Sequence, residues 1–173
     1  MQQFIDKSRY YLAVEYITKI SHCIEALPPD ALWKRPNDTS NSIGNLLLHL
    51  AGNIRQWIVG GVGEREVTRD RASEFAAIDG ATKEALLEDL QRAVGEVDAI
   101  LADLKPNQLL DERTIQGRKT TVFEAIYHVV EHFAMHTGQI VLMTKTFAPG
   151  AVSFYRDADG LAQPKWGGSE GMV

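Results

Sequence analysis

The sequence predicts an all-α protein built as a four-helix bundle, and three observations support this prediction. Four long stretches repeat apolar residues every three to four positions, which is the spacing of amphipathic helices. Proline or glycine follows each stretch, and signals for strands are few. Helices with one apolar face bury it against each other, so four of them favour a bundle.

The first predicted helix covers about residues 3–26. Its apolar residues recur at near-helical spacing: Phe4, Leu12, Ile17, Ile20 and Ile24. Pro28 and Pro29 end it, because proline lacks an amide hydrogen and restricts the residue before it. The polar loop that follows carries Trp33, whose indole we expect to plug the core.

The second predicted helix covers about residues 42–59. Its apolar face consists of Ile43, Leu46, Leu47, Leu50, Ile54 and Trp57. One of three polar residues is expected to cap its start: Ser40, Asn41 or Ser42. Gly60 and Gly61 are expected to stop it. The polar segment 63–80 is then a long excursion that holds at most a short helical turn.

The third predicted helix covers about residues 82–104, and Pro106 lies just beyond its end. Its apolar stripe consists of Leu86, Leu90, Val94, Val97 and Leu101. A small hairpin around Gln116 and Gly117 is expected before the next helix. The long connection between the second and third helices permits a crossover, so a simple up-down-up-down order is not required.

The fourth predicted helix covers about residues 121–147. It opens with Thr121 and Glu124 in the spacing of a capping box, and Pro149 follows its end. Residues 149–173 are expected to be an irregular tail, with Trp166 in it. At 173 residues the chain has the length of one domain, and we treat residues 1–173 as a single helical domain.

Charge and composition exclude several classes of protein. The net charge is −5, and the densest basic run, Arg65 to Arg71, is interleaved with acids, so we expect no nucleic-acid partner. Cys23 is the one cysteine, which excludes an internal disulfide and a cysteine-rich zinc site, and we expect it to be buried packing. No leader peptide and no apolar run of about 20 residues is evident. We therefore expect a cytoplasmic protein without a membrane partner.

Three of the five histidines lie four residues apart on the fourth helix, at His128, His132 and His136. Side chains four apart lie on one face of a helix, about 5–6 Å from each other at Cβ, so two imidazoles can converge on one ion. Three ligands spread over two turns cannot easily do so. We therefore expect His128 to be a neighbour of the site or a core residue, and His22 to be structural.

His49 shares its side of the second helix with Leu46 and Leu50, so it should point inward. A buried imidazole needs a hydrogen-bond partner or a metal, because an unpaired polar group costs about 1–3 kcal/mol. If the second and fourth helices are neighbours, His49 faces His132 and His136. Three neutral imidazoles plus water make a catalytic-type zinc or nickel site. The alternative is a metal-free bundle in which the histidines are ordinary core residues.

Two segments carry a family resemblance. Residues 42–53, SIGNLLLHLAGN, resemble the second-helix histidine segment of the DinB/YfiT-like superfamily. Residues 132–140, HFAMHTGQI, resemble its closing signature, His-x-x-x-His followed by Gly-Gln. Trp33 also stands in the matching place, and the resemblance extends to about Phe147. It implies an up-down-down-up four-helix bundle, often a homodimer, with a zinc or nickel ion held by three histidines, here His49, His132 and His136.

Members that this chain resembles include S-transferases and isomerases that use low-molecular-weight thiols such as bacillithiol or mycothiol, and others are described as metal-dependent hydrolases. We expect a metal-dependent enzyme of one of these types with a small-molecule substrate. The alternative is a non-catalytic, metal-stabilised binding or stress-response module. Thr137 stands where many relatives carry arginine, which leaves the substrate open.

Ligating imidazoles need partners that orient them. Asn45 and Asn53 flank His49 by one turn on either side, and Gln139 follows His136 on the same face. Each is expected either to contact the site or to bridge two helices. Glu131 is a candidate base, although its angular offset from His132 favours a solvated role. No residue is assigned a catalytic role on the sequence.

Overall fold

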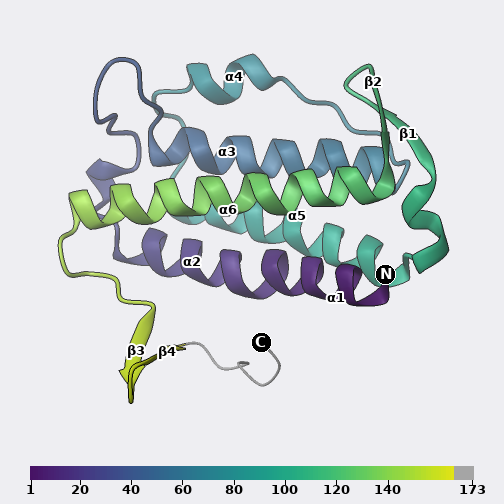
Figure 1. Ribbon diagram of the computed structural model, residues 1–173. Coiled ribbons are helices and arrows are strands. Elements are labelled where there is room, and N and C mark those ends of the chain that lie inside the picture. The colour runs from purple at the N-terminus through teal and green to yellow at the C-terminus, as the bar shows by residue number, and fades with distance from the viewer. Residues whose placement is uncertain (166–173) are drawn as a thin grey trace.

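The structure is a computed structural model that describes residues 1–165, and these residues are mostly helical (Figure 1). Four long helical segments account for most of it. The first is continuous and consists of α1 (Gln2–Tyr10), the π-helical η1 (Tyr11–Tyr16) and α2 (Ile17–Ala26). The second consists of α3 (Ile43–Ile54) and the π-helical η3 (Arg55–Val62). The others are α5 (Lys83–Asp103) and α6 (Val122–Phe147).

Shorter elements connect and follow these segments. Single helical turns or short helices occur at η2 (Pro29–Ala31), α4 (Arg71–Ala76) and η4 (Pro106–Leu110). Two antiparallel hairpins pair β1 (Glu112–Ile115) with β2 (Arg118–Thr121) and β3 (Tyr155–Ala158) with β4 (Leu161–Pro164). Figure 1 shows α4 above α3 and the β3–β4 hairpin below the end of α6.

Contacts between the segments give their relative directions. Arg9, near the start of the first segment, pairs with Asp98 near the end of α5. Lys83, at the start of α5, donates to the carbonyl of Leu27 just after the first segment, so the two run in opposite directions. Arg55 of the second segment pairs with Asp89 of α5. Farther along both helices, Gly63 lies against Ile100, so the second segment runs parallel to α5.

α6 runs opposite to the second segment and parallel to the first. His132 of α6 faces His49 of α3. One turn earlier on α6, His128 lies on Trp57, which follows His49 in η3. Near the start of the first segment, Phe4 packs on Phe123 of α6. One continuous cluster of buried apolar side chains fills the space between the segments, with Phe133 of α6 among the largest fully buried.

The expected stop at Gly60 and Gly61 is wrong, because the helix continues through both residues to Val62 in π-helical turns. The side chain of Ile115 lies against Gly61, in the space that a Cβ would occupy. The glycine therefore admits the β1 strand rather than ending the helix. This role depends on a residue more than 50 positions away, so no local pattern indicates it.

The hairpin expected around Gln116 and Gly117 is confirmed. Both residues have positive φ, at 53° and 73°, as a two-residue hairpin turn requires. The expected irregular tail is wrong for residues 155–164, which form the β3–β4 hairpin. Asp159 and Gly160 make its turn with φ of 55° and 81°. Trp166 lies outside the described residues.

Trp33 packs against the core as expected, and its indole nitrogen donates to the carbonyl of Ala81 at 3.1 Å. Its ring lies directly on Gly44 in the first turn of α3. Within residues 1–165, no helix combines the length and the apolar character needed to cross a membrane.

Candidate metal centre

Two capped helices carry the predicted histidines. Ser42 begins α3 with a capping box: its hydroxyl accepts from the Asn45 amide, and the Asn45 side chain accepts from the Ser42 amide. Thr121 and Glu124 form the predicted box at the start of α6. These caps satisfy amides that a helix leaves unpaired at its start.

The structure brings His49, His132 and His136 together. The Nε2 atoms of His49 and His132 lie 3.0 Å apart, and those of His132 and His136 lie 3.1 Å apart. One nitrogen from each of the three rings falls within 4.8 Å of the others. The residues are 5%, 9% and 9% exposed, so these nitrogens converge inside the protein.

The spacing of these nitrogens fits a shared divalent ion. Two imidazole nitrogens at the usual 2.0–2.1 Å from a zinc ion lie roughly 3.0–3.4 Å apart, depending on coordination geometry. The observed 3.0 and 3.1 Å agree with that spacing. Three imidazole nitrogens are also a donor set that zinc and nickel accept. The three buried histidines could therefore hold a metal ion.

Hydrogen bonds on the far side of two rings orient their lone pairs toward the centre. His49 Nδ1 lies 2.9 Å from Oε2 of Glu74, and since a carboxylate only accepts, this nitrogen carries the proton. His136 Nδ1 likewise faces Oε1 of Gln139 at 2.7 Å. A neutral imidazole has one N–H, so both Nε2 atoms present lone pairs to the centre.

His132 completes the cluster without an orienting partner. Its Nδ1 is buried and has no hydrogen-bond partner among the described residues. A proton on its Nε2 can be donated to the lone pair of only one of the two facing Nε2 atoms, those of His49 and His136. A proton on Nδ1 leaves three lone pairs converging on one point. In either tautomer at least two lone pairs face the centre, where a divalent ion would accept them.

Burial keeps the three rings neutral, as metal ligands must be. Burial lowers the pKa of His49 and of His136 below the ordinary value for histidine. For His132, burial and the neighbouring His136 and His49 lower the pKa to about 3. A charged imidazolium would be poorly solvated and close to two other rings, so the neutral form, which carries one N–H, prevails at neutral pH.

Behind His49 lies a buried ion pair that the sequence analysis missed. Arg69 holds both carboxylate oxygens of Glu74, Nε to Oε1 at 2.6 Å and Nη2 to Oε2 at 2.8 Å. Their side chains are 5% and 9% exposed. Arg69 Nη2 also lies 3.2 Å from His49 Nδ1, a longer contact that arises because both groups donate to the same oxygen. The pair holds Glu74 in the orientation that His49 requires.

The ion pair is anchored further out. Arg69 Nη1 donates to the side-chain oxygen of Gln56 at 2.7 Å, and Gln116 of the β1–β2 turn donates to the same oxygen at 2.5 Å. A chain of hydrogen bonds thus joins the hairpin turn to His49. The half-buried ring of Phe75 lies against the ring of His49, with 4.7 Å between the centroids, and is tilted to it.

Glu74 reaches the site because the segment that carries it is fixed at both ends. Asp70 caps α4 by accepting from the amides of Ala72 and Ser73. The side-chain amide of Asn45 donates to the carbonyls of Glu74 and Ala77 at 2.9 and 2.7 Å. Asn45 therefore bridges α3 to the α4 segment that carries Glu74.

Of the other polar residues singled out in the sequence, one contacts the site and the others lie outside it. Gln139 contacts the site as expected. Asn53 is buried, and its side-chain oxygen has no hydrogen-bond partner within residues 1–165. His128 stands outside the cluster and lies against Trp57, with ring centroids 4.2 Å apart. Glu131 is exposed, which agrees with the solvated role.

His22 and Cys23, for which the sequence predicts structural roles, are not part of the histidine cluster. The exposed His22 stacks on Phe154 of the tail. Cys23 is fully buried, and burial raises the pKa of its thiol, so it is not an activated nucleophile.

Only a weak signal could have indicated Arg69 and Glu74. Their segment, 63–80, has no apolar periodicity, and 25 positions separate Glu74 from His49. The one local cue is Asp70, which caps a short helix that includes Glu74. A cap residue predicts where a helix begins, but it does not predict that this helix packs over α3.

Comparisons with known proteins agree with the fold. A family model described as "Protein of unknown function (DUF1572)" matches residues 1–154. A conserved protein from Enterococcus faecalis has a similar structure, with a TM-score of 0.68 and 17% identity over 82% of this chain and 95% of that one. No curated protein matches the chain.

Two DinB-like proteins of known structure are also similar. The one from Bacillus subtilis has a TM-score of 0.65 and 21% identity, covering 89% of this chain and 97% of that one. The one from Bacillus cereus has a TM-score of 0.66 and 12% identity, covering 87% and 96%. At these identities the likeness shows the fold, and the predicted resemblance to DinB-like proteins is confirmed.

Proposed function

The chain belongs to the family described as DUF1572, and we propose that it binds one zinc or nickel ion through His49, His132 and His136 and works as a metal-dependent enzyme. One observation carries the proposal. Three buried imidazoles from two helices converge on one point, and hydrogen bonds to Glu74 and Gln139 aim two of the lone pairs at it.

The reaction we propose is S-transfer with a low-molecular-weight thiol, or hydrolysis. A divalent ion at such a site lowers the pKa of bound water or holds a thiol as thiolate. The chain's own residues keep the three rings neutral and fixed. Glu74 accepts a hydrogen bond from the Nδ1–H of His49, and Gln139 accepts one from the Nδ1–H of His136, so both protons stay on Nδ1. The Arg69 guanidinium holds Glu74 in place, because it donates to both carboxylate oxygens.

We also propose that residues 1–173 form one domain with the up-down-down-up bundle order. The antiparallel and parallel pairings of the four segments support this order, and the single continuous core supports one domain. The homodimer and the thiol partner implied by the family resemblance stay predictions. Size-exclusion chromatography with light scattering tests the first of these.

Metal analysis of the full chain tests the site. The wild-type protein should bind about one equivalent of zinc or nickel, and His49→Ala, His132→Ala and His136→Ala should each lose most of it. His22→Ala is the matched control, because His22 is exposed and lies against Phe154. Retention of a full equivalent by the three site variants would rule out the assignment.

The burial of the three rings favours a second candidate, a non-catalytic module in which the ion holds the helices together. Cobalt substitution separates the two. An enzyme site keeps an open position, so added thiol should change the visible spectrum of the cobalt protein. A closed four-coordinate site should leave the spectrum unchanged, and a screen of thiols against electrophiles should then find no turnover.

A further inference from the structure

A cavity lies on the opposite side of α6 from the histidines. Its volume is about 480 Å³, within the range of small-molecule sites. One wall is a stripe of α6 at helical spacing, from Ala134 through Thr137 and Val141 to Lys145. Thr137 follows His136 directly but points about 100° away from it around the helix. None of the three candidate ligands lines this cavity.

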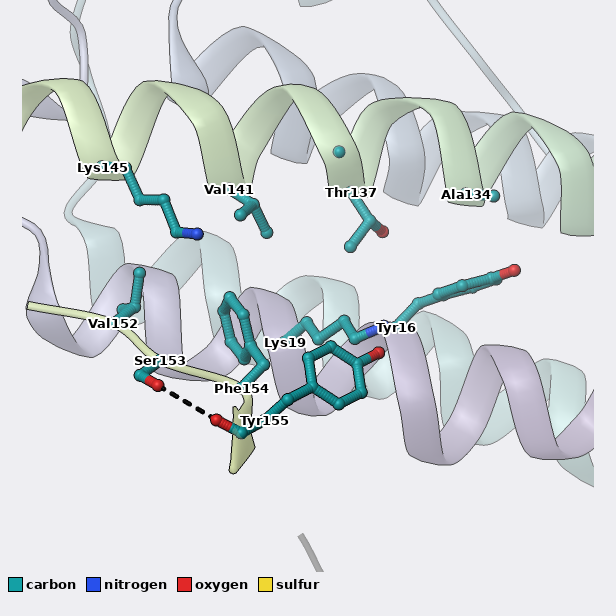
Figure 2. Close-up of a pocket in the computed structure, with 11 residues that line it drawn as sticks. Tyr16, Lys19, Ala134, Thr137, Val141, Lys145, Val152, Ser153, Phe154 and Tyr155 are labelled. Carbon is teal, nitrogen blue, oxygen red and sulfur yellow. Dashed lines mark hydrogen bonds between the residues drawn. The ribbon is translucent and has the colours of Figure 1, made fainter. Parts of the chain in front are cut away.

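The facing walls come from α2, η1 and the segment after α6. Figure 2 shows the ring of Phe154 rising toward Val141, and the ammonium of Lys19 lies over the ring of Tyr155, 5.4 Å from its centroid. The segment is held in place: Val152 and Phe154 are buried, and Lys165 bonds back to Phe154 through its amide and to Ser153 through its ammonium. The cavity is therefore formed before any ligand arrives.

The charges around the cavity favour an anion. None of its lining residues is acidic, and two are lysines. Lys19 is already matched, because its ammonium lies 2.6 Å from Glu15. Lys145 has no ion pair or hydrogen bond within residues 1–165, and Figure 2 shows its ammonium extending over Val152. One unmatched positive charge remains.

The rest of the lining specifies the body of the ligand. Val141, Val152 and Phe154 offer an apolar surface beside the ammonium of Lys145. A single unmatched charge suits a monoanion better than a phosphate monoester, which carries nearly two charges at neutral pH. Arginine, the usual partner of phosphate, is absent from the lining residues.

We propose that this cavity binds a small monocarboxylate with an apolar body. The carboxylate pairs with Lys145, and the apolar part lies along Val141, Val152 and Phe154. The site is separate from the metal centre, so its occupancy does not depend on the metal function proposed above.

Calorimetric titration of the full chain with 2-naphthoate and octanoate tests the proposal, with the corresponding neutral amides as matched probes. At least one acid should bind about tenfold or more tightly than its amide. Lys145→Met should remove that preference. Lys119→Met, a charge change at an exposed position of β2, should retain it. His136→Ala should also retain it, because the metal centre is not involved.

Three results would overturn the proposal. One is failure of both acids to bind at millimolar concentration. Another is equal affinity for acid and amide in the wild-type protein, or an unchanged preference in Lys145→Met. The third is loss of acid binding in His136→Ala, which would place the carboxylate at the histidines instead.

Discussion

The side chain that decides how His49 presents itself is Glu74. It is acceptor-only, so it selects the tautomer of His49 in which Nε2 carries the lone pair. Arg69 prevents Glu74 from turning away by binding both of its oxygens. His132, by contrast, has no such partner on its Nδ1 among the described residues. The three rings therefore differ in how firmly hydrogen bonds fix their orientation, and His49 is fixed most firmly, through Glu74 and Arg69.

Replacing Glu74 by glutamine should weaken zinc binding by about 10- to 100-fold, the usual cost of losing a partner that orients a ligand. Glutamine keeps the size but lacks the charge, and its amide can present a donor to His49. Competition with a chelator of known affinity measures the change. Glu66→Gln is the control, because Glu66 is exposed in the same connection. Equal affinities for the two variants would contradict the role given to Glu74.

At the scale of the elements, close approach between neighbours explains features that helix propensity does not. Gly44 lies in the first turn of α3 under the ring of Trp33, and Gly61 admits Ile115. In both places a glycine lets another segment touch the helix backbone. Gly95, in the middle of α5, meets no neighbour within 4 Å of where a Cβ would stand.

Gly44→Ala and Gly95→Ala should therefore change stability in opposite directions. Alanine at Gly44 must displace a rigid indole ring, which costs about 1–3 kcal/mol, the usual range for overpacking. Alanine at Gly95 should stabilise the helix by up to about 1 kcal/mol. Urea unfolding followed by circular dichroism measures both. A neutral or stabilising Gly44→Ala would show that Trp33 can move freely.

A salt bridge ties η3 to α5 and makes stability depend on pH. The hydrogen bonds from Arg55 hold the pKa of Asp89 below its ordinary value. A lowered carboxyl pKa stabilises the fold above the unfolded pKa of about 4, and this contribution disappears as pH falls through the folded value.

Asp89→Asn should accordingly destabilise the protein at pH 7 by up to about 1 kcal/mol, since the pair is partly exposed and screened. The difference from wild type should shrink steadily below pH 4. Thermal melts of both proteins from pH 7 to pH 3 test this. A difference that stays constant over the range would mean that the carboxylate charge contributes nothing.

For the whole molecule, the histidine cluster joins two segments that are far apart in the chain. His49 and His132 are 83 positions apart, yet their Nε2 atoms lie 3.0 Å from each other. An ion bound there contacts only the folded state, so its binding free energy adds to folding stability.

Saturating zinc should therefore raise the melting temperature. At one hundred times the dissociation constant, the linkage adds about 2.7 kcal/mol, or roughly 5–10 °C for a domain of this size. His136→Ala should lose most of the shift, and chelation should reverse it in the wild-type protein. An equal shift in both proteins would indicate that zinc binds elsewhere.

What the sequence determined by itself is the local part of the structure. The four long helical segments, the cap residue Thr121 and the turn at Gln116 follow from patterns within a few residues, and Ser42 is one of three cap candidates that the sequence offers for the second helix. So does the placement of His132 and His136 on one helical face, because the α-helix repeats every 3.6 residues. The inward position of His49 on the second helix makes it a candidate third ligand, and the family resemblance implies the full set of three histidines.

Only the tertiary structure decided the rest, because it depends on which distant segments touch. The continuation of the helix through Gly60 and Gly61 reflects contact with Ile115. Glu74 reaches His49 because its short helix folds back over α3, on a path that no periodicity encodes. The cavity beside Lys145 exists because the segment after α6 returns to α2. Local patterns specify the helices and their faces, whereas packing across long sequence separations specifies which polar groups meet between them.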